Sequence, residues 1–214
     1  MFIRGTRVQT PPDQIDAAIA NFKQKVLPTA RSTPGNVGAA LLVDRKTGAG
    51  VGITYWESAK ALAASEQMGI QARTQAVKNV SGSEIVNVER FEVVIMDRAA
   101  PPKEGTFSRV NGINADPDKV DALTVFIRNQ ALPVIKAQKG YRACIMAVDR
   151  QTGRCVVSTG WDTLADLQAS EPKVTALRQE AGKTAGASGA VEVEIFEAAS
   201  LDLAQVPSGT PSNR

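Results

Sequence analysis

Residues 43–58 read VDRKTGAGVGITYWES, and residues 148–163 read VDRQTGRCVVSTGWDT. Both stretches place a polar Asp-Arg-x-Thr-Gly turn between two more apolar segments, which predicts a β-hairpin. Each then ends in a tryptophan, an acidic residue and a Ser or Thr. Ser58 and Thr163 are therefore expected to cap the helix that follows the hairpin.

The two stretches are part of a tandem duplication, because the second begins 105 residues after the first and the same offset recurs along the chain of 214 residues. Further matched pairs at this offset are Phe2/Phe107, Leu27/Leu132, Arg73/Arg178 and Phe91/Phe196. We therefore expect one domain at 1–99, a linker at 100–105, a second domain at 106–204 and a flexible tail at 205–214.

Periodicity within each repeat predicts the order βαββαβ. In the first copy a strand at 2–9 precedes a helix with an apolar stripe, the hairpin follows, and a second helix leads to a last strand at 85–96. Pro28 and Pro133 should bend the first helix, and the second helix should break partway. The order is that of the ferredoxin-like fold, which belongs to the α+β class.

Two apolar runs, residues 39–43 and 144–148, do not alternate with polar residues as a sheet with one solvated face requires. Such strands are expected to be buried on both sides. We therefore predict that the two antiparallel sheets pack face to face as a pseudo-dimeric α+β barrel within one chain. Further assembly of tandem chains into a homo-oligomer stays open.

Composition excludes several classes of function. The chain has no histidine, so His-dependent nucleophiles and His-ligated metal or haem sites are ruled out, and we expect no metal and no cofactor. Its two cysteines, Cys144 and Cys155, are expected to be reduced. A dispersed net charge of +3 predicts no nucleic-acid partner, and the lack of a long apolar run predicts no membrane contact and a cytoplasmic location.

The bent Leu-Pro helix, the Val-Asp-Arg-x-Thr-Gly hairpin and the Tyr55-Trp56-Glu57-Ser58 segment resemble the antibiotic biosynthesis monooxygenase-like family of the dimeric α+β barrel superfamily. The resemblance implies a pocket between sheet and helices, with Trp56 and Trp161 beside it. It also implies that Arg73 and Arg178 are of a type that orients acidic or quinone substrates in some relatives.

The same family includes cofactor-free oxygenases of polycyclic aromatic substrates, haem-degrading enzymes and small quinol oxygenases. This sequence departs from two of its patterns. Glu66 and Glu171 stand near the position of the haem-degrading branch's histidine, and Gly52 and Val157 stand where the oxygenase branch has an asparagine. Haem ligation of that type is therefore not expected.

The candidate catalytic residues are Trp56, Trp161, Arg73 and Arg178, and the candidate ligand-binding residues are Tyr55, Glu66 and Glu171. Each also has a plain structural interpretation. The tryptophans can be core residues, the arginines can form salt bridges, and the glutamates can be exposed helix residues rather than general bases of raised pKa. Because Gly160 replaces Tyr55 in the second copy, the two pockets are not expected to be equivalent.

Two functions remain. The first is a barrel that binds a small hydrophobic or aromatic molecule without catalysis, or serves as an interaction module. The alternative is a cofactor-independent monooxygenase acting on a phenolic or quinol-type aromatic substrate. The monooxygenase requires a water-poor cavity, so side chains filling both clefts between sheet and helices would exclude it.

Overall fold

The computed structural model describes residues 1–207 and 209. In both hairpin turns, the aspartate side chain accepts hydrogen bonds that stabilise the turn. In the first turn Asp44 accepts hydrogen bonds from the Lys46 amide at 2.9 Å and from Thr47 Oγ1 at 2.7 Å. Gly48 then closes the turn with a φ of +79°, a conformation that favours glycine. Asp149 makes the same contacts in the second turn, so the motif forms the predicted hairpins.

The chain divides into two compact units. Unit 1 comprises Met1–Arg90, Pro102–Gly105 and Phe196–Val206, and unit 2 comprises Phe91–Pro101, Thr106–Ile195 and the described residues that follow Val206. These units follow spatial contacts, whereas the domain limits expected from the duplication remain predictions of where each repeat begins and ends.

Both units have the same order of elements, and two strands pass from one unit into the other. Unit 1 holds β1 (Phe2–Gln9), α1 (Ile15–Asn21), α2 (Leu27–Ser32), β2 (Asn36–Val43), β3 (Ala49–Trp56), α3 (Ala59–Ala64) and α4 (Glu66–Lys78). Unit 2 holds β5 (Phe107–Asn114), α5 (Val120–Phe126), α6 (Leu132–Lys136), β6 (Tyr141–Val148), β7 (Arg154–Trp161), α7 (Leu164–Ala169) and α8 (Glu171–Thr184). The shared strands are β4 (Glu84–Arg98) and β8 (Glu192–Asp202).

The sheet of each unit is extended by the last strand of the other sequence repeat. In unit 1 the order is β1-β3-β2, and the far edge of β2 pairs with the end of β8, Val43 lying opposite Glu197. In unit 2 the order is β5-β7-β6, and β6 pairs with the end of β4, Val148 lying opposite Glu92. The last strand of each repeat therefore crosses over.

The hydrogen-bonded order of all eight strands is β1-β3-β2-β8-β5-β7-β6-β4, a closed barrel. Residues 39–43 are buried throughout, as their continuous apolar character predicted. The predicted α+β class, with two ferredoxin-like halves whose strands form an antiparallel barrel, is confirmed.

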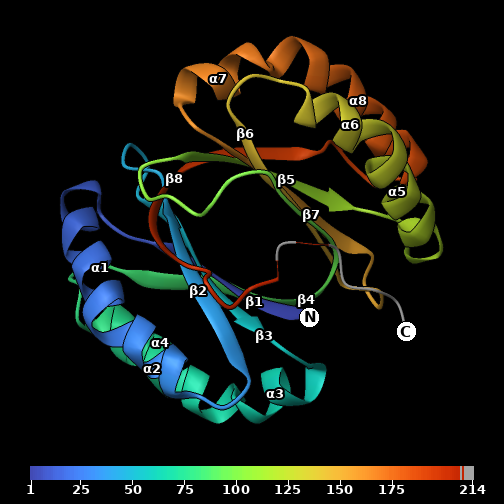
Figure 1. Ribbon diagram of the computed structural model, residues 1–214. Coiled ribbons are helices and arrows are strands. Elements are labelled where there is room, and N and C mark those ends of the chain that lie inside the picture. Colours follow the sequence, from blue (N-terminus) through green and yellow to red (C-terminus); the bar gives the residue numbers. More distant parts are fainter. Residues whose placement is uncertain (208, 210–214) are drawn as a thin grey trace. The chain divides into compact units, whose positions relative to one another are not determined.

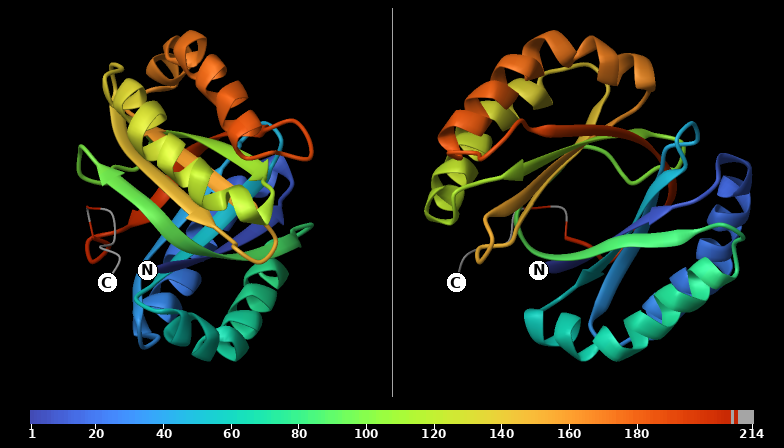
Figure 2. Two further views of the ribbon diagram at one scale, coloured as in Figure 1. Left: turned by 90° about the vertical axis from the view of Figure 1, so that its right-hand side faces the viewer. Right: turned by 180° about the vertical axis from the view of Figure 1, so that it is seen from behind.

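Helices cover one face of the sheet in each unit: α1 to α4 in unit 1 and α5 to α8 in unit 2 (Figures 1 and 2). The helix that carries Pro28 continues without a break. A π turn at Phe22–Val26 directly precedes α2, and this wider turn accommodates the proline, which has no backbone N–H to donate. Ser58 caps α3 by accepting a hydrogen bond from the Ala61 amide, as predicted. The expected break in the second helix falls at Ser65, between α3 and α4.

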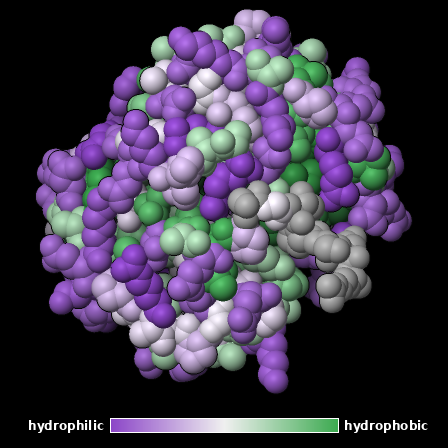
Figure 3. All heavy atoms as spheres, viewed as in Figure 1, coloured by the Kyte–Doolittle hydropathy of each residue, from purple (hydrophilic) through white to green (hydrophobic). Residues whose placement is uncertain are grey.

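Hydrophilic residues dominate the molecular face in Figure 3, and the hydrophobic residues on it form small separate areas. Within the described part of the chain, no helix combines the length and the apolar character needed to span a bilayer.

Candidate functional site

A partly open cavity of about 140 Å³ lies inside unit 1, between its strands and its helices. Alternate residues of β1 and β3 supply its floor, because successive side chains of a strand point to opposite faces. The end of α1, the π turn and α4 supply its walls. The floor consists of Arg4, Thr6, Val8, Gly52, Thr54 and Trp56, and the walls include Ala18, Asn21, Phe22, Val26, Met68, Gly69, Ala72, Arg73 and Val77.

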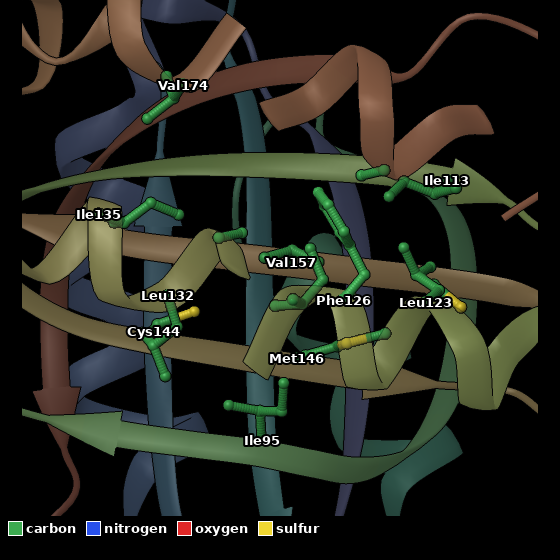
Figure 4. Close-up of a cluster of buried hydrophobic side chains, with 14 of the residues drawn as sticks. Ile95, Ile113, Leu123, Phe126, Leu132, Ile135, Cys144, Met146, Val157 and Val174 are labelled. Carbon is green, nitrogen blue, oxygen red and sulfur yellow. The ribbon is translucent and has the colours of Figure 1, made fainter. Parts of the chain in front are cut away.

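The equivalent space in unit 2 is almost filled, with a remaining cavity of about 40 Å³. Six positions that are small or polar in unit 1 carry bulkier apolar side chains in unit 2. The pairs are Ala18/Leu123, Asn21/Phe126, Ala30/Ile135, Gly52/Val157, Gly69/Val174 and Ala72/Leu177. Figure 4 shows Leu123 and Phe126 among these buried side chains, close to Met146 and Val157.

At some matched positions the larger side chain is in unit 1, but these positions do not offset the filling of unit 2. Phe22 faces the cavity of unit 1 where unit 2 has the smaller Ile127, and Val26 corresponds to Ala131. The cavity therefore depends on the glycines and alanines of the first repeat. The expected inequality of the two pockets is present, but its cause lies in these positions and not at Tyr55.

The two tryptophans occupy equivalent places with different surroundings. Each indole Nε1 donates to the threonine two residues earlier, Trp56 to Thr54 and Trp161 to Thr159, both at 3.0 Å. Trp56 lines the cavity. Trp161 is fully buried and packs against Tyr141, with a centroid distance of 6.2 Å and an edge-to-face geometry.

Tyr55 is buried and does not line the cavity. It precedes Trp56 on β3, so strand alternation directs the two side chains to opposite faces of the sheet. The hydroxyl of Tyr55 is therefore placed away from any ligand bound beside Trp56.

Arg73 lines the cavity, and Arg178 lines the small remnant in unit 2. Arg73 Nη2 donates to Glu66 at 2.9 Å, and Arg178 Nη1 donates to Glu171 at the same distance. Arg178 also donates through Nε to Asn111 at 3.1 Å. The residue matching Asn111 in the first repeat is Thr6, so Arg73 lacks that acceptor.

Glu66 is an ionised ion-pair partner. Partial burial raises the pKa of Glu66, but hydrogen bonds from Arg90 and Arg73 and the charge of Arg4 outweigh that effect and lower the pKa to about 2. Partial burial also raises the pKa of Glu171, but the opposing interactions, of which the hydrogen bond from Arg178 is the largest, together outweigh that effect, so the pKa of Glu171 is lowered below its usual range. A carboxylate of such low pKa is a poor general base near neutral pH, so the geometry does not support that interpretation.

Sequence reasoning missed Arg4 and its counterpart Arg109. Arg4 is 2% exposed, lies 5.4 Å from the Trp56 ring centroid, and donates through Nη2 to the Leu62 carbonyl at 2.8 Å and to Glu66 at 3.0 Å. Arg109 lies over Trp161 in the same way, at 5.8 Å. The sequence did contain a sign of their importance, because Arg4 and Arg109 are separated by the same 105 residues as the other matched pairs of the two repeats.

Cys144 and Cys155 are both free and buried, as expected. Burial raises the pKa of the Cys144 thiol to about 12 and that of Cys155 to about 11, so neither is a ready nucleophile. Within residues 1–207 and 209, no group of three or more Cys, Asp or Glu side chains is arranged to hold a metal ion.

Several known proteins resemble this chain. Two uncharacterised proteins of Mycobacterium tuberculosis H37Rv are 29% and 26% identical to it over 203 and 205 residues. Each alignment covers 95% of this chain, with 89% and 84% of the respective relative.

Solved structures show the same fold at low sequence identity. A candidate monooxygenase from Fusobacterium nucleatum aligns with a TM-score of 0.70 at 11% identity, covering 98% of this chain and 95% of its own. An anthrone oxidase-like protein aligns with a TM-score of 0.64, also at 11% identity, covering 99% and 97%.

The segment that matches a family model lies within the repeat that forms the cavity. Residues 1–77 match the family described as antibiotic biosynthesis monooxygenase, and this span includes Arg4, Trp56 and Arg73. The resemblance predicted from the sequence is confirmed over residues 1–77, which are similar to the antibiotic biosynthesis monooxygenase family.

Proposed function

We propose that unit 1 binds a small aromatic molecule in its cavity and that unit 2 serves as a packed structural partner without a ligand. The observation that carries this proposal is the difference between the cavities of about 140 Å³ and 40 Å³ in two repeats of one fold. A chain that needed only a stable core would gain by filling both spaces.

The size and the lining of the cavity favour a single aromatic ring as the ligand. An apolar protein cavity of about 150 Å³ is known to accept benzene. Here Trp56, Phe22 and Val26 supply apolar surface, while Thr54 and Thr6 offer hydroxyl groups on the floor. A mainly apolar pocket with few polar groups is typical of a small-molecule site.

Isothermal titration calorimetry of the whole chain tests this proposal with toluene, benzyl alcohol and benzoate as probes. We expect saturable binding with one molecule per chain. Gly52→Val should abolish binding, because it places in unit 1 the side chain that Val157 has in unit 2. The matched control, Val157→Ala, should leave binding unchanged. Lack of binding of all three probes, or equal loss in the control, would overturn the proposal.

Cofactor-independent oxygenation is a second candidate, favoured by the position of Trp56 and Arg73 in the cavity lining and within the family match. A quinol would lose a proton, its anion would be stabilised by Arg73, and it would reduce dioxygen itself. The balanced outcome is one oxygen atom added to the ring and one released as water, giving a hydroxyquinone. Glu66 is not offered as the base, because of its low pKa.

Oxygen consumption with a panel of hydroquinones separates the two candidates. Protein-dependent oxygen uptake that Gly52→Val abolishes would support the oxygenase. Binding of aromatic probes without oxygen uptake would support the non-catalytic function.

A further inference from the structure

The cavity of unit 1 is bordered by an excess of positive charge, and we propose that its ligand is an aromatic carboxylate whose anionic group bridges Arg4 and Arg73. This inference rests on the proposed function, because it assigns a charge to the aromatic molecule bound there. It makes Arg90 a positioning residue for the same site.

Three guanidinium groups share one carboxylate in unit 1. Arg4, Arg73 and Arg90 all pair with Glu66, at 3.0, 2.9 and 2.7 Å. The ion pairs that these three arginines form with described residues all go to that one glutamate. An anion arriving in the cavity would therefore meet uncompensated positive charge in a partly desolvated place, where electrostatic attraction is stronger than in water.

The second repeat lacks this excess. The position of Arg90 is occupied by Ile195, and among the described residues Glu171 pairs with Arg109 and Arg178 alone. Because Arg90 is on β4 and half-exposed, it is not needed to fill the core. Its contact with Glu66 Oε2 instead occupies part of the carboxylate that would otherwise be available to Arg73.

Some donor groups of the two cavity-lining arginines have no acceptor within the part of the chain that the structure describes. The hydrogen bonds of Arg4 and Arg73 to described residues all pass through Nη2. In unit 2 the counterparts also use Nη1, Arg109 donating to Ser170 at 3.1 Å and Arg178 to Glu171 at 2.9 Å. The Nη1 groups of unit 1 are therefore the available donors.

Gly69 leaves these two donors close together. A Cβ on Gly69 would lie 2.8 Å from Arg73 Nη1 and 3.0 Å from Arg4 Nη1, so both atoms are near one point on α4. Val174 occupies the matching position in unit 2. Two donors from separate guanidinium groups suit the two oxygens of one carboxylate, and charge-assisted hydrogen bonds of this kind are strong.

Calorimetry with benzoate and its neutral isostere benzamide tests the charge of the ligand. We expect benzoate to bind about tenfold more tightly or better, as a charged hydrogen-bond partner implies. The dissociation constant of benzoate should rise with added salt, and that of benzamide should not. Equal affinity for the two probes would overturn this inference and leave the proposed function intact. Failure of both probes and of toluene would overturn the proposed function as well.

Two variants that copy unit 2 probe the arginine arrangement. Thr6→Asn should give Arg73 an acceptor equivalent to the one that Arg178 has in Asn111. Arg90→Ile should leave Glu66 Oε2, which Arg90 now contacts, available to Arg73. Each should reduce the ratio of benzoate to benzamide affinity. Arg90→Ile should do so without changing benzamide binding, because Arg90 does not line the cavity. The matched control Asn111→Thr, in unit 2, should leave the ratio unchanged. A ratio that neither variant moves would contradict the roles given to Arg73 and Arg90.

Discussion

Gly52 faces Phe22 across open space in unit 1, where a methyl group on the glycine would lie 3.8 Å from Phe22 Cε2. That separation is ordinary van der Waals contact, so a Cβ at this position fits without displacing the backbone. The first prediction follows. Gly52→Val should raise the free energy of unfolding by about 1–2 kcal/mol, because it removes a flexible strand glycine and buries apolar surface.

Urea denaturation of the wild type and of Gly52→Val measures this change. If stability rises while ligand binding is lost, the glycine is retained for the ligand and not for the fold. A destabilised variant would mean that the cavity is already occupied by side chains that the valine displaces. It would then count against an open site beside Phe22.

The second prediction concerns the filled counterpart. Leu123 is fully buried in unit 2 and matches Ala18 of the cavity wall. Leu123→Ala should lower the free energy of unfolding by about 2–5 kcal/mol, because it removes packed atoms and leaves a void. Val125→Ala, on the same helix but 54% exposed, is the control and should change stability by about 0.5 kcal/mol or less.

Much of the fold was predictable because its determinants are local or repeated. Asp44 and Gly48 specify the turn within five residues, and the offset between repeats requires only that the second copy fold like the first. The crossing of β4 and β8 into the other unit was not predicted. Hydrophobic pattern identifies a strand and its buried face, but it does not say which neighbouring strand it joins.

The site was predicted less well than the fold. Trp56 and Arg73 were identified through the family resemblance, and both line the cavity. Arg4 was missed, because an isolated charge in a strand is usually solvent-exposed, and its burial depends on Trp56 and Glu66, which are distant in sequence. Tyr55 was selected because it is unique to one repeat, a property that says nothing about which face it occupies.

The third prediction is a pH effect. The pKa of Glu66 is lowered from 4.5 to about 2 in the folded chain, so its ion pairs stabilise the fold above the unfolded pKa. This stabilisation should be lost as the pH falls from about 4.5 to about 2. Denaturation midpoints measured across that range should fall less steeply for Glu66→Gln than for the wild type. Glu180→Gln, on α8 and half-exposed, is the control that should keep the wild-type slope.

The fourth prediction separates backbone strain from steric clash, using two glycines with nearly equal positive φ. Gly105 has a φ of +77° and open space around it, so Gly105→Ala should cost only the strain of a left-handed residue, about 1–2 kcal/mol. Gly48 has a φ of +79°, but a Cβ there would lie 1.8 Å from the Thr10 carbonyl oxygen. Gly48→Ala should therefore cost about 3 kcal/mol or more.

The two variants should also differ in ligand binding. The Gly48 carbonyl accepts a hydrogen bond from the Thr10 amide at 2.9 Å, and Thr10 lines the cavity. Relief of the clash in Gly48→Ala must move the Thr10 backbone, so benzoate affinity should fall. Gly105→Ala touches no cavity residue and should bind benzoate as the wild type does. Unchanged benzoate affinity in a folded Gly48→Ala chain would show that this end of the cavity does not contact the ligand.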